Sequence, residues 1–337
     1  MARSGPRSVD ERPFHAWLAH RLPAGHSGLL PLGDDAAALR PPPGRVAVVT
    51  TDSLVEGTHF LTESPPRAVG AAAVGVSLSD VAAKGAEPAA VLLALLMPPG
   101  TPTAWAEQLT EGAEATSRLY GAEIVGGDTK PSPVRSVVST VLGWGDPHHL
   151  APRSAARPGD RVVTTGTVGR GGLAAWRLEH GPGSARQRLT ALLEVRPRVR
   201  EGVALGAFAH AMMDTSDGLA DSARLLSAAS GVRIEVDEER LPLARGLERV
   251  VPPRARRAAA LFGGDYELLA TLPPGRLSPA SQAVARAGGQ LTEIGRVVRG
   301  RGAWLGRAGT WEPMPPAGWQ PFARASRRSG RAYHAVL

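Results

Sequence analysis

The chain has 337 residues, too many for one ordinary hydrophobic core, and this length predicts two domains of about 150 residues each. Its formal charge is +8, but only Lys84 and Lys130 are lysines and 4% of residues are aromatic, so no basic run interleaved with aromatics indicates nucleic-acid binding. Cysteine is absent, which excludes disulfides, thiolate zinc sites and a cysteine nucleophile, and favours a reducing compartment.

The first half of the chain alternates predicted helices and strands, judged by the period of its apolar residues and by the glycines and prolines between them. The first residues lack the apolar core of a signal peptide, so we expect a cytoplasmic protein. The longest apolar run, 89–97, is far shorter than the ~20 residues that span a bilayer, so we expect a buried strand and no membrane association. The predicted elements are helices at 14–22, 67–84 and 104–120, and strands at 46–49, 89–97, 123–125 and 134–144.

A segment rich in proline and glycine, 145–160, predicts the domain boundary. Beyond it we expect strands at 161–165, 232–236, 266–272 and 291–298, helices ending at 180, 211, 229, 262 and 286, and a surface loop at 182–190. The fold class is therefore mixed α/β (α+β). The predicted domains are 1–148 and 149–325, followed by a basic tail, 326–337.

Carboxylates recur where these elements end. They are Asp34, Asp35, Asp52, Asp80, Asp128, Asp214, Asp217 and Asp265. If they converged in one cavity, their mutual repulsion would raise their pKa values unless cations neutralised them. Magnesium is the natural cation, and a polyphosphate is its natural ligand. Each acid also has an ordinary explanation: the Asp34 pair suits a solvated turn, and Asp80 could pair with Lys84 one helical turn later.

Two glycine-rich segments could approach a phosphate. Gly126 and Gly127 precede Asp128 at a predicted strand end, where free amide groups could bind an anion. A second cluster, 166–172, precedes a helix and could cradle a phosphate at its N-terminus. The chain contains neither a complete GxGxxG nor a GxxxxGK[ST] motif, so no Rossmann or P-loop site is predicted. In DTSDGLADS, Ser216 or Asp217 is expected to cap the following helix.

Six motifs in order carry a family resemblance. GDDAA, TTDSLVEGTHF, LSDVAAKGAEP, GGDT, DTSDGLADS and GGDYELL, between about Leu32 and Phe322, resemble thiamine-monophosphate kinase. That family belongs to an ATP-binding superfamily with aminoimidazole ribonucleotide synthetase, selenophosphate synthetase and the hydrogenase maturation factor HypE. The resemblance implies a two-domain PurM-like fold, an N-terminal domain that forms a homodimer through its sheet, and ATP in the cleft with several Mg²⁺ ions.

The resemblance also assigns roles to matching positions. The implied metal ligands are Asp35, Thr51, Asp52, Asp80, Asp128, Asp214 and Asp217. The implied ATP contacts are Thr50, Gly127, Asp128, Arg153 and Ser216. His59 would contact thiamine monophosphate, and Trp319 would lie against its cationic thiazolium ring. Without the family, His59 is an ordinary strand-edge histidine and Trp319 an ordinary packing residue.

The chain departs from the family pattern at three positions. Family members usually carry Glu before the Asp of the last motif, and here that position is Gly264. A carboxylate that helps to hold the substrate is therefore missing unless Asp265 or Glu267 replaces it. Ser77 replaces a usual Asn and Lys84 a usual Met. These changes bear on substrate affinity more than on phosphoryl transfer.

The implied activity is direct in-line transfer of the γ-phosphoryl group of ATP to thiamine monophosphate, the last step of thiamine diphosphate synthesis. A phosphate acceptor is already anionic, so catalysis would consist of positioning and charge neutralisation, with no side chain as nucleophile or base. Two alternatives stay open. One is a sister ATP-dependent enzyme, HypE-like or aminoimidazole ribonucleotide synthetase-like, and the other is a nucleotide-binding regulator without turnover.

Overall fold

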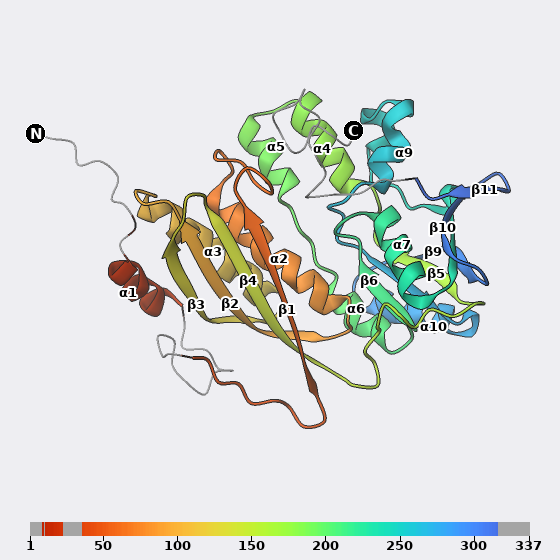
Figure 1. Cartoon of the computed structure of the whole chain (residues 1–337), viewed down its shortest axis with the longest axis horizontal. Helices are drawn as coiled ribbons and strands as arrows, with labels where there is room; N and C mark the ends of the chain where they lie inside the picture. The colour runs from red at the N-terminus through yellow and green to blue at the C-terminus, as the bar shows by residue number, and fades with distance from the viewer. Residues whose placement is uncertain (1–8, 10, 23–35, 316–337) are drawn as a thin grey trace, which may run out of the picture.

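Two β-sheets, each with its own helices, form the frame of the protein (Figure 1). The computed structural model describes residue 9, residues 11–22 and residues 36–315. Four features predicted from the sequence lie outside these residues: Asp34, Asp35, Trp319 and the basic tail at 326–337. The first sheet has the order β1-β4-β2-β3. Its strands are β1 (Val46–Val55), β2 (Glu87–Met97), β3 (Glu123–Pro131) and β4 (Ser136–Gly145).

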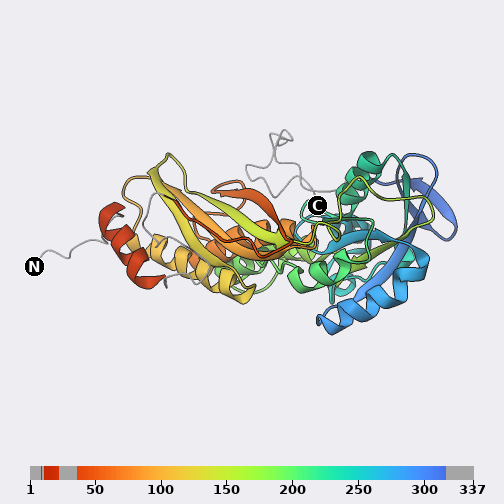
Figure 2. The ribbon, with the colours of Figure 1, turned by 90° about the horizontal axis from the view of Figure 1, so that it is seen from below.

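Helices α2 (Pro66–Ala82) and α3 (Thr103–Leu119) cover one face of this sheet (Figure 2). Val91 and Leu93 of β2 point into the core beneath these helices, whereas Leu92 between them is 43% exposed. The two helices lie close together because a Cβ atom on Gly70 would stand 1.9 Å from the carbonyl oxygen of Leu109. Helix α1 (Glu11–Arg21) packs near β3, where the His15 ring meets the Thr129 hydroxyl at 3.4 Å. Among the described residues, the other face of the sheet has no helix on it.

The second sheet has the order β11-β10-β7-β9-β5-β8-β6. Its strands are β5 (Arg161–Thr165), β6 (Ala211–Asp214), β7 (Arg233–Asp237), β8 (Leu268–Leu272), β9 (Leu291–Val298), β10 (Gly302–Arg307) and β11 (Thr310–Pro313). Its helices are α4 (Arg170–His180), α5 (Ala185–Leu192), α6 (Val199–Gly206), α7 (Leu219–Ser230), α8 (Leu247–Val250), α9 (Pro253–Leu261) and α10 (Leu277–Arg286). Most sheet and helix segments fall where the sequence predicts them, and the fold class is mixed α/β with two domains, as expected.

Several local predictions are wrong. The segment predicted as a surface loop at 182–190 contains helix α5, which begins with a capping box in which Ser184 accepts a hydrogen bond from the Gln187 amide. Helix α6 ends at Gly206, before the predicted 211, because the next residues lead into strand β6. The hairpin β10–β11 and the short helix α8 were not predicted. That hairpin turns at Ala308 and Gly309, both with positive φ.

The two halves of the chain are joined at the C-terminal end of α2. A Cβ atom on Gly202 of α6 would stand 2.2 Å from the Ala82 carbonyl oxygen, so the two helices pack in close contact. Lys84, just beyond α2, donates hydrogen bonds to the carbonyls of Ala151 and Met212, at 3.0 and 2.8 Å. It therefore ties α2 to the connecting segment and to β6, and does not pair with Asp80. Within the described part of the chain, no helix is long and apolar enough to cross a membrane.

Candidate active site

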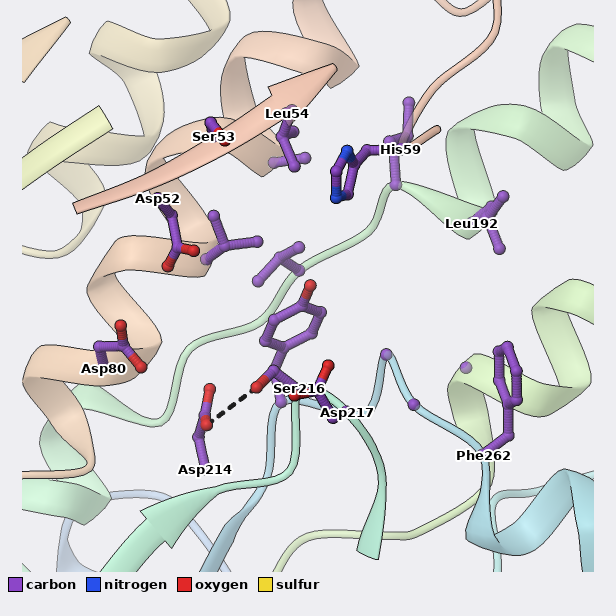
Figure 3. Close-up of a pocket in the computed structure, with 18 of the residues that line it drawn as sticks. Asp52, Ser53, Leu54, His59, Asp80, Leu192, Asp214, Ser216, Asp217 and Phe262 are labelled. Carbon is purple, nitrogen blue, oxygen red and sulfur yellow. Dashed lines mark hydrogen bonds between the residues drawn. The ribbon is translucent and has the colours of Figure 1, made fainter. Parts of the chain in front are cut away.

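A cavity of about 360 Å³ lies where the two domains meet, and side chains from both domains line it (Figure 3). One side of it carries four carboxylates, which we call the acidic cluster: Asp52, Asp80, Asp214 and Asp217. The first two come from the N-terminal domain and the other two from the C-terminal domain. These four of the acids predicted to converge are thus divided between the domains, and the packing of the domains brings them together.

Asp52 and Asp80 come from β1 and α2. Asp52 lies inside β1, which continues to Val55, and does not follow the strand end as the sequence suggested. The Thr50 hydroxyl donates to Asp80 Oδ2 at 2.7 Å, so this threonine positions a carboxylate. Burial raises the pKa of Asp52 to about 7, and the charges of Asp80, Asp214 and Asp217 add to the rise. Such a group is poorly stabilised as an anion until a cation joins it.

Asp214 and Asp217 flank the turn after β6. Asp214 accepts hydrogen bonds from the hydroxyls of Ser79 and Ser216, at 2.8 and 3.0 Å. Burial raises its pKa to about 6, Asp80 adds to this, and the two serines and Arg153 oppose it. The pKa of Asp217 is also raised, chiefly by burial.

The prediction that Ser216 or Asp217 caps the next helix is wrong. Helix α7 begins at Leu219, with Gly218 as its N-cap and no side-chain cap. Gly218 has a φ of 104°, and a Cβ atom on it would stand 2.4 Å from the Leu261 carbonyl oxygen, so the position requires glycine. Both side chains are therefore available to the cavity.

The acidic cluster has the chemistry of a site for hard divalent cations. Its donors are carboxylate oxygens, and Arg153 is the single cationic side chain among the described residues that line the cavity. No group of three or more His, Cys, Asp or Glu side chains in residues 36–315 and the described N-terminal residues is spaced as a finished metal centre. The residues fit ions that complete their coordination with phosphate oxygens and water, as Mg²⁺ does.

Two predicted metal ligands lie elsewhere. Thr51 pairs with Thr140 across β1 and β4, Thr140 pairs with Leu92, and the Thr51 and Thr140 hydroxyls meet at 2.9 Å. These residues are on the uncovered face of the first sheet. Asp128 pairs with Ala94, two residues beyond Leu92, and therefore lies on the same face. Asp128 is exposed and forms an ion pair with Lys130 at 2.8 Å. Neither residue lines the cavity of a single chain.

The predicted glycine turn before Asp128 is not a turn. Strand β3 runs from Glu123 to Pro131, so Gly126 and Gly127 lie inside it. A Cβ atom on Gly127 would stand 1.9 Å from the Leu93 carbonyl oxygen, so the glycine permits close pairing of β3 with β2. The strand continued beyond its predicted end because its backbone pairs with β2, a contact that the local sequence does not reveal.

The glycine cluster before α4 does not present a free phosphate cradle. Asp265 occupies it: its carboxylate accepts hydrogen bonds from the amides of Gly169 and Gly171, at 2.6 and 2.8 Å. Asp265 is 1% exposed, and burial raises its pKa to about 7 against the effect of these two hydrogen bonds. The suggestion that Asp265 replaces the missing glutamate is therefore wrong, because its carboxylate is directed to the helix.

Glu267 does not replace the missing glutamate either. Its carboxylate is 1% exposed and accepts hydrogen bonds from Arg198 and from the Thr165 hydroxyl. Gly264, at the position of the family glutamate, does line the cavity. Its φ is 91°, a conformation that a side chain other than glycine rarely adopts. The backbone conformation of this loop therefore favours glycine at position 264, and the carboxylates of Asp265 and Glu267 do not line the cavity.

The other side of the cavity is apolar, and sequence reasoning missed it. We call it the apolar wall: Leu54, Ala72, Val76, Leu193, Val195, Phe262 and Tyr266. Tyr266 has a φ of 54°, which is strained for a residue with a side chain. His59 lies beside this wall (Figure 3), and its Nδ1 accepts a hydrogen bond from the Val55 amide. Burial lowers the pKa of His59, which favours the neutral ring.

The signals for this wall were weak. The small residues of α2 indicate that another segment packs closely on the helix, but the sequence does not show which one. In the structure it is the segment at Val195, which a Cβ atom on Gly75 would approach to 2.9 Å. Together, the cavity offers an acidic end suited to metal ions and phosphates, and an apolar end suited to a flat organic group.

Comparisons with known proteins divide the chain into the same two domains as the structure. Models of the AIR synthase related protein family match the chain, the N-terminal domain at residues 33–145 and the C-terminal domain at residues 157–304. Thiamine-monophosphate kinase of Halobacterium salinarum is 41% identical over 79% of this chain and 87% of the relative. The enzyme of that name from Caulobacter vibrioides is 36% identical over 85% of this chain and 84% of the relative.

Solved structures are similar as well. Thiamine-monophosphate kinase from Stenotrophomonas maltophilia superposes with a TM-score of 0.77 at 31% identity, covering 91% of this chain and 99% of that one. AaThiL complexed with AMPPCP and TMP gives 0.71 at 32% identity, covering 85% and 90%. A structure of hydrogenase maturation protein HypE in complex with ATP gives 0.68 at 21% identity, covering 84% and 88%, a likeness of fold alone.

Proposed function

The chain belongs to the thiamine-monophosphate kinase family of AIR synthase related proteins, and on this premise we propose that it transfers the γ-phosphoryl group of ATP to thiamine monophosphate. The products are thiamine diphosphate and ADP. The observation that carries the proposal is the cavity, which places four carboxylates at one end and the apolar wall at the other. A related enzyme, AaThiL, binds an ATP analogue and TMP together.

The two ends of the cavity suit the two parts of the reaction. Asp52, Asp80, Asp214 and Asp217 would hold Mg²⁺ ions, which when bound neutralise the charge of the phosphates. Arg153 and Ser216 line the acidic end and would contact the nucleotide phosphates, and Thr50 supports Asp80. His59 and the apolar wall would receive the thiamine part, and Trp319 would complete this end from outside the described residues.

The chemical step needs little from the side chains beyond placement. The acceptor is a phosphate oxygen, which is already anionic near neutral pH, so no general base is required. The bond from this oxygen to the γ-phosphorus forms as the bond from the γ-phosphorus to the β-phosphate oxygen breaks. The walls of the cavity hold donor and acceptor in line and keep water from the γ-phosphorus.

We further propose a homodimer formed by the uncovered face of the first sheet. Val49 and Leu92 lie on this face, 60% and 43% exposed, and large exposed side chains on a bare sheet favour burial against a partner. Thr51 and Asp128 share the face. A second copy of the chain seated there would supply the setting in which these two residues act as ligands, together with Asp35.

Incubation with Mg²⁺, ATP and thiamine monophosphate tests the proposal. The expected products are thiamine diphosphate and ADP in equal amounts, with no product when Mg²⁺ is chelated. Phosphorus NMR of the product distinguishes transfer to the acceptor phosphate from hydrolysis, which would release inorganic phosphate. A protein that binds ATP and yields no thiamine diphosphate would be a regulator or a sister enzyme, and would refute the proposal.

A further inference from the structure

Arg170, the first residue of α4, joins three main-chain carbonyls from two separate segments. Its Nη1 donates to the Glu194 carbonyl at 2.6 Å. Its Nη2 donates to the carbonyls of Asp265 and Gly264, at 2.8 and 3.3 Å. An arginine fork is suited to this task, because its donors are fixed in one plane and point in different directions. Neither the site described above nor the family motifs assign a role to this residue.

The contact with the Gly264 loop is reciprocal. Asp265 accepts hydrogen bonds from the amides on either side of Arg170, while Arg170 donates to the main chain on either side of the Asp265 amide. The segments also touch directly, since a Cβ atom on Gly171 would stand 2.0 Å from the Gly263 carbonyl oxygen. The start of α4 and this loop therefore form one closely packed unit.

The contact with Glu194 extends this unit across the cavity. Leu193 and Val195 flank Glu194, and both belong to the apolar wall. Leu193 packs in the core cluster of the N-terminal domain, and Val195 lies against Gly75 of α2. Arg170, a residue of the C-terminal domain, thus holds a strip of wall that packs on the N-terminal domain. Tyr266, next to the Gly264 loop, belongs to the same wall.

We propose that Arg170 is a positioning residue that fixes the apolar wall and so sets the affinity for the thiamine part of thiamine monophosphate. The inference rests on the proposed function and names the part of the substrate that this wall selects. Arg170 acts through the strip at Glu194 and the loop at Gly264, not by contact with the reacting phosphates. The acidic cluster is held by other residues, Thr50, Ser79 and Ser216.

The test compares Arg170→Met with Arg196→Met. Arg196 is the matched control, because it pairs with the exposed Glu194 carboxylate and leaves the Glu194 carbonyl untouched. For Arg170→Met we expect the KM for thiamine monophosphate to rise about tenfold, with the KM for ATP and kcat within about twofold of wild type. Arg196→Met is expected to match wild type in all three constants. Arg170→Lys keeps the charge but not the forked set of donors, so its KM for thiamine monophosphate is expected to lie between those of wild type and Arg170→Met.

A merely structural role would change these constants together. Equal rises in both KM values, a fall in kcat alone, or no change in any constant would overturn the inference. Thermal melting of each variant shows whether it folds. If Arg170→Met does not melt cooperatively, Arg170→Lys replaces it in the test, and a rise in its KM for thiamine monophosphate without a matching rise in the KM for ATP is the expected result. The wild-type protein, assayed alongside, tests the proposed function by itself: its failure to form thiamine diphosphate would refute the function, whereas an active wild type with no KM split in the variants would refute only the role of Arg170.

Discussion

Ser79 of α2 donates a hydrogen bond to the carboxylate of Asp214 at the end of β6, with 2.8 Å between Oγ and Oδ2. Both residues are buried, and they belong to different domains. This contact joins the domains at the acidic cluster itself, where carboxylates from both domains meet.

Ser79→Ala is expected to lower the free energy of unfolding by about 1–3 kcal/mol, because it leaves a buried carboxylate oxygen without its partner. Urea unfolding in the absence of Mg²⁺ measures the change. Thr190→Ala is the control, since Thr190 is exposed on α5 and its hydroxyl donates to a carbonyl of its own helix. Equal stability of the two variants would show that the Ser79 contact contributes nothing.

Asp217→Asn is expected to lower kcat by roughly 10²-fold or more, because the acidic cluster loses a donor for the cations that neutralise the phosphates. The fold should persist, since the Asp217 carboxylate accepts no hydrogen bond from the residues that the structure describes, and burial opposes its ionisation. Turnover at saturating Mg²⁺, with circular dichroism of the same sample, is the measurement. Asp146→Asn is the control, because Asp146 lies outside the cavity. Unchanged turnover in Asp217→Asn would contradict the assignment.

In the metal-free protein, Asp52 is expected to make the free energy of unfolding fall as the pH rises from about 4 to about 7. The pKa of Asp52 is raised from 3.8 to about 7 in the folded chain, so in this window the folded state binds more protons than the unfolded state. Asp52→Asn removes the group, and its stability should therefore fall less steeply across the window.

The check is the difference between the unfolding free energies of wild type and Asp52→Asn, measured in a chelating buffer at several pH values. The difference should shift in favour of the variant as the pH rises. Added Mg²⁺ should restore stability to the wild type at neutral pH more than to the variant. A difference that is flat, or of opposite slope, would contradict the account.

Leu92→Glu is expected to dissociate the proposed dimer, because it places a charge at the centre of the uncovered sheet face. Sedimentation velocity of wild type and variant at equal concentration is the measurement. Leu119→Glu is the control: Leu119 is 70% exposed, but it ends α3, on the helical side of the domain. A wild type that sediments as a monomer would refute the proposed assembly, as would a Leu92→Glu protein that stays dimeric.

Gly264→Glu is expected to destabilise the protein by about 1–2 kcal/mol and not to improve the KM for thiamine monophosphate, because the φ of 91° disfavours any side chain. Gly264→Ala separates the two effects, since it imposes the same backbone strain without a carboxylate. A lower KM in Gly264→Glu than in Gly264→Ala, with equal stability, would show that the loop can still use the family carboxylate.

The sequence was informative wherever a structure depends on near neighbours in the chain. The apolar run at 89–97 predicted β2, and the breakers at Gly85 and Pro88 predicted the end of α2. Helix α5 could have been predicted too, from Ser184 and Gln187 at the spacing of a capping box. The family motifs pointed to the four carboxylates that line the cavity.

Only the tertiary structure decided which of these groups meet. Asp52 and Thr51 are adjacent in the chain, yet they face opposite sides of the first sheet, and the helices packed on one side make Asp52 part of the cavity. Asp265 binds amides 94 and 96 residues away, and so it supports α4 where the sequence suggested a substrate contact. A buried carboxylate takes the nearest donors that folding brings to it, and those donors are set by how the domains pack, which no local pattern of residues contains.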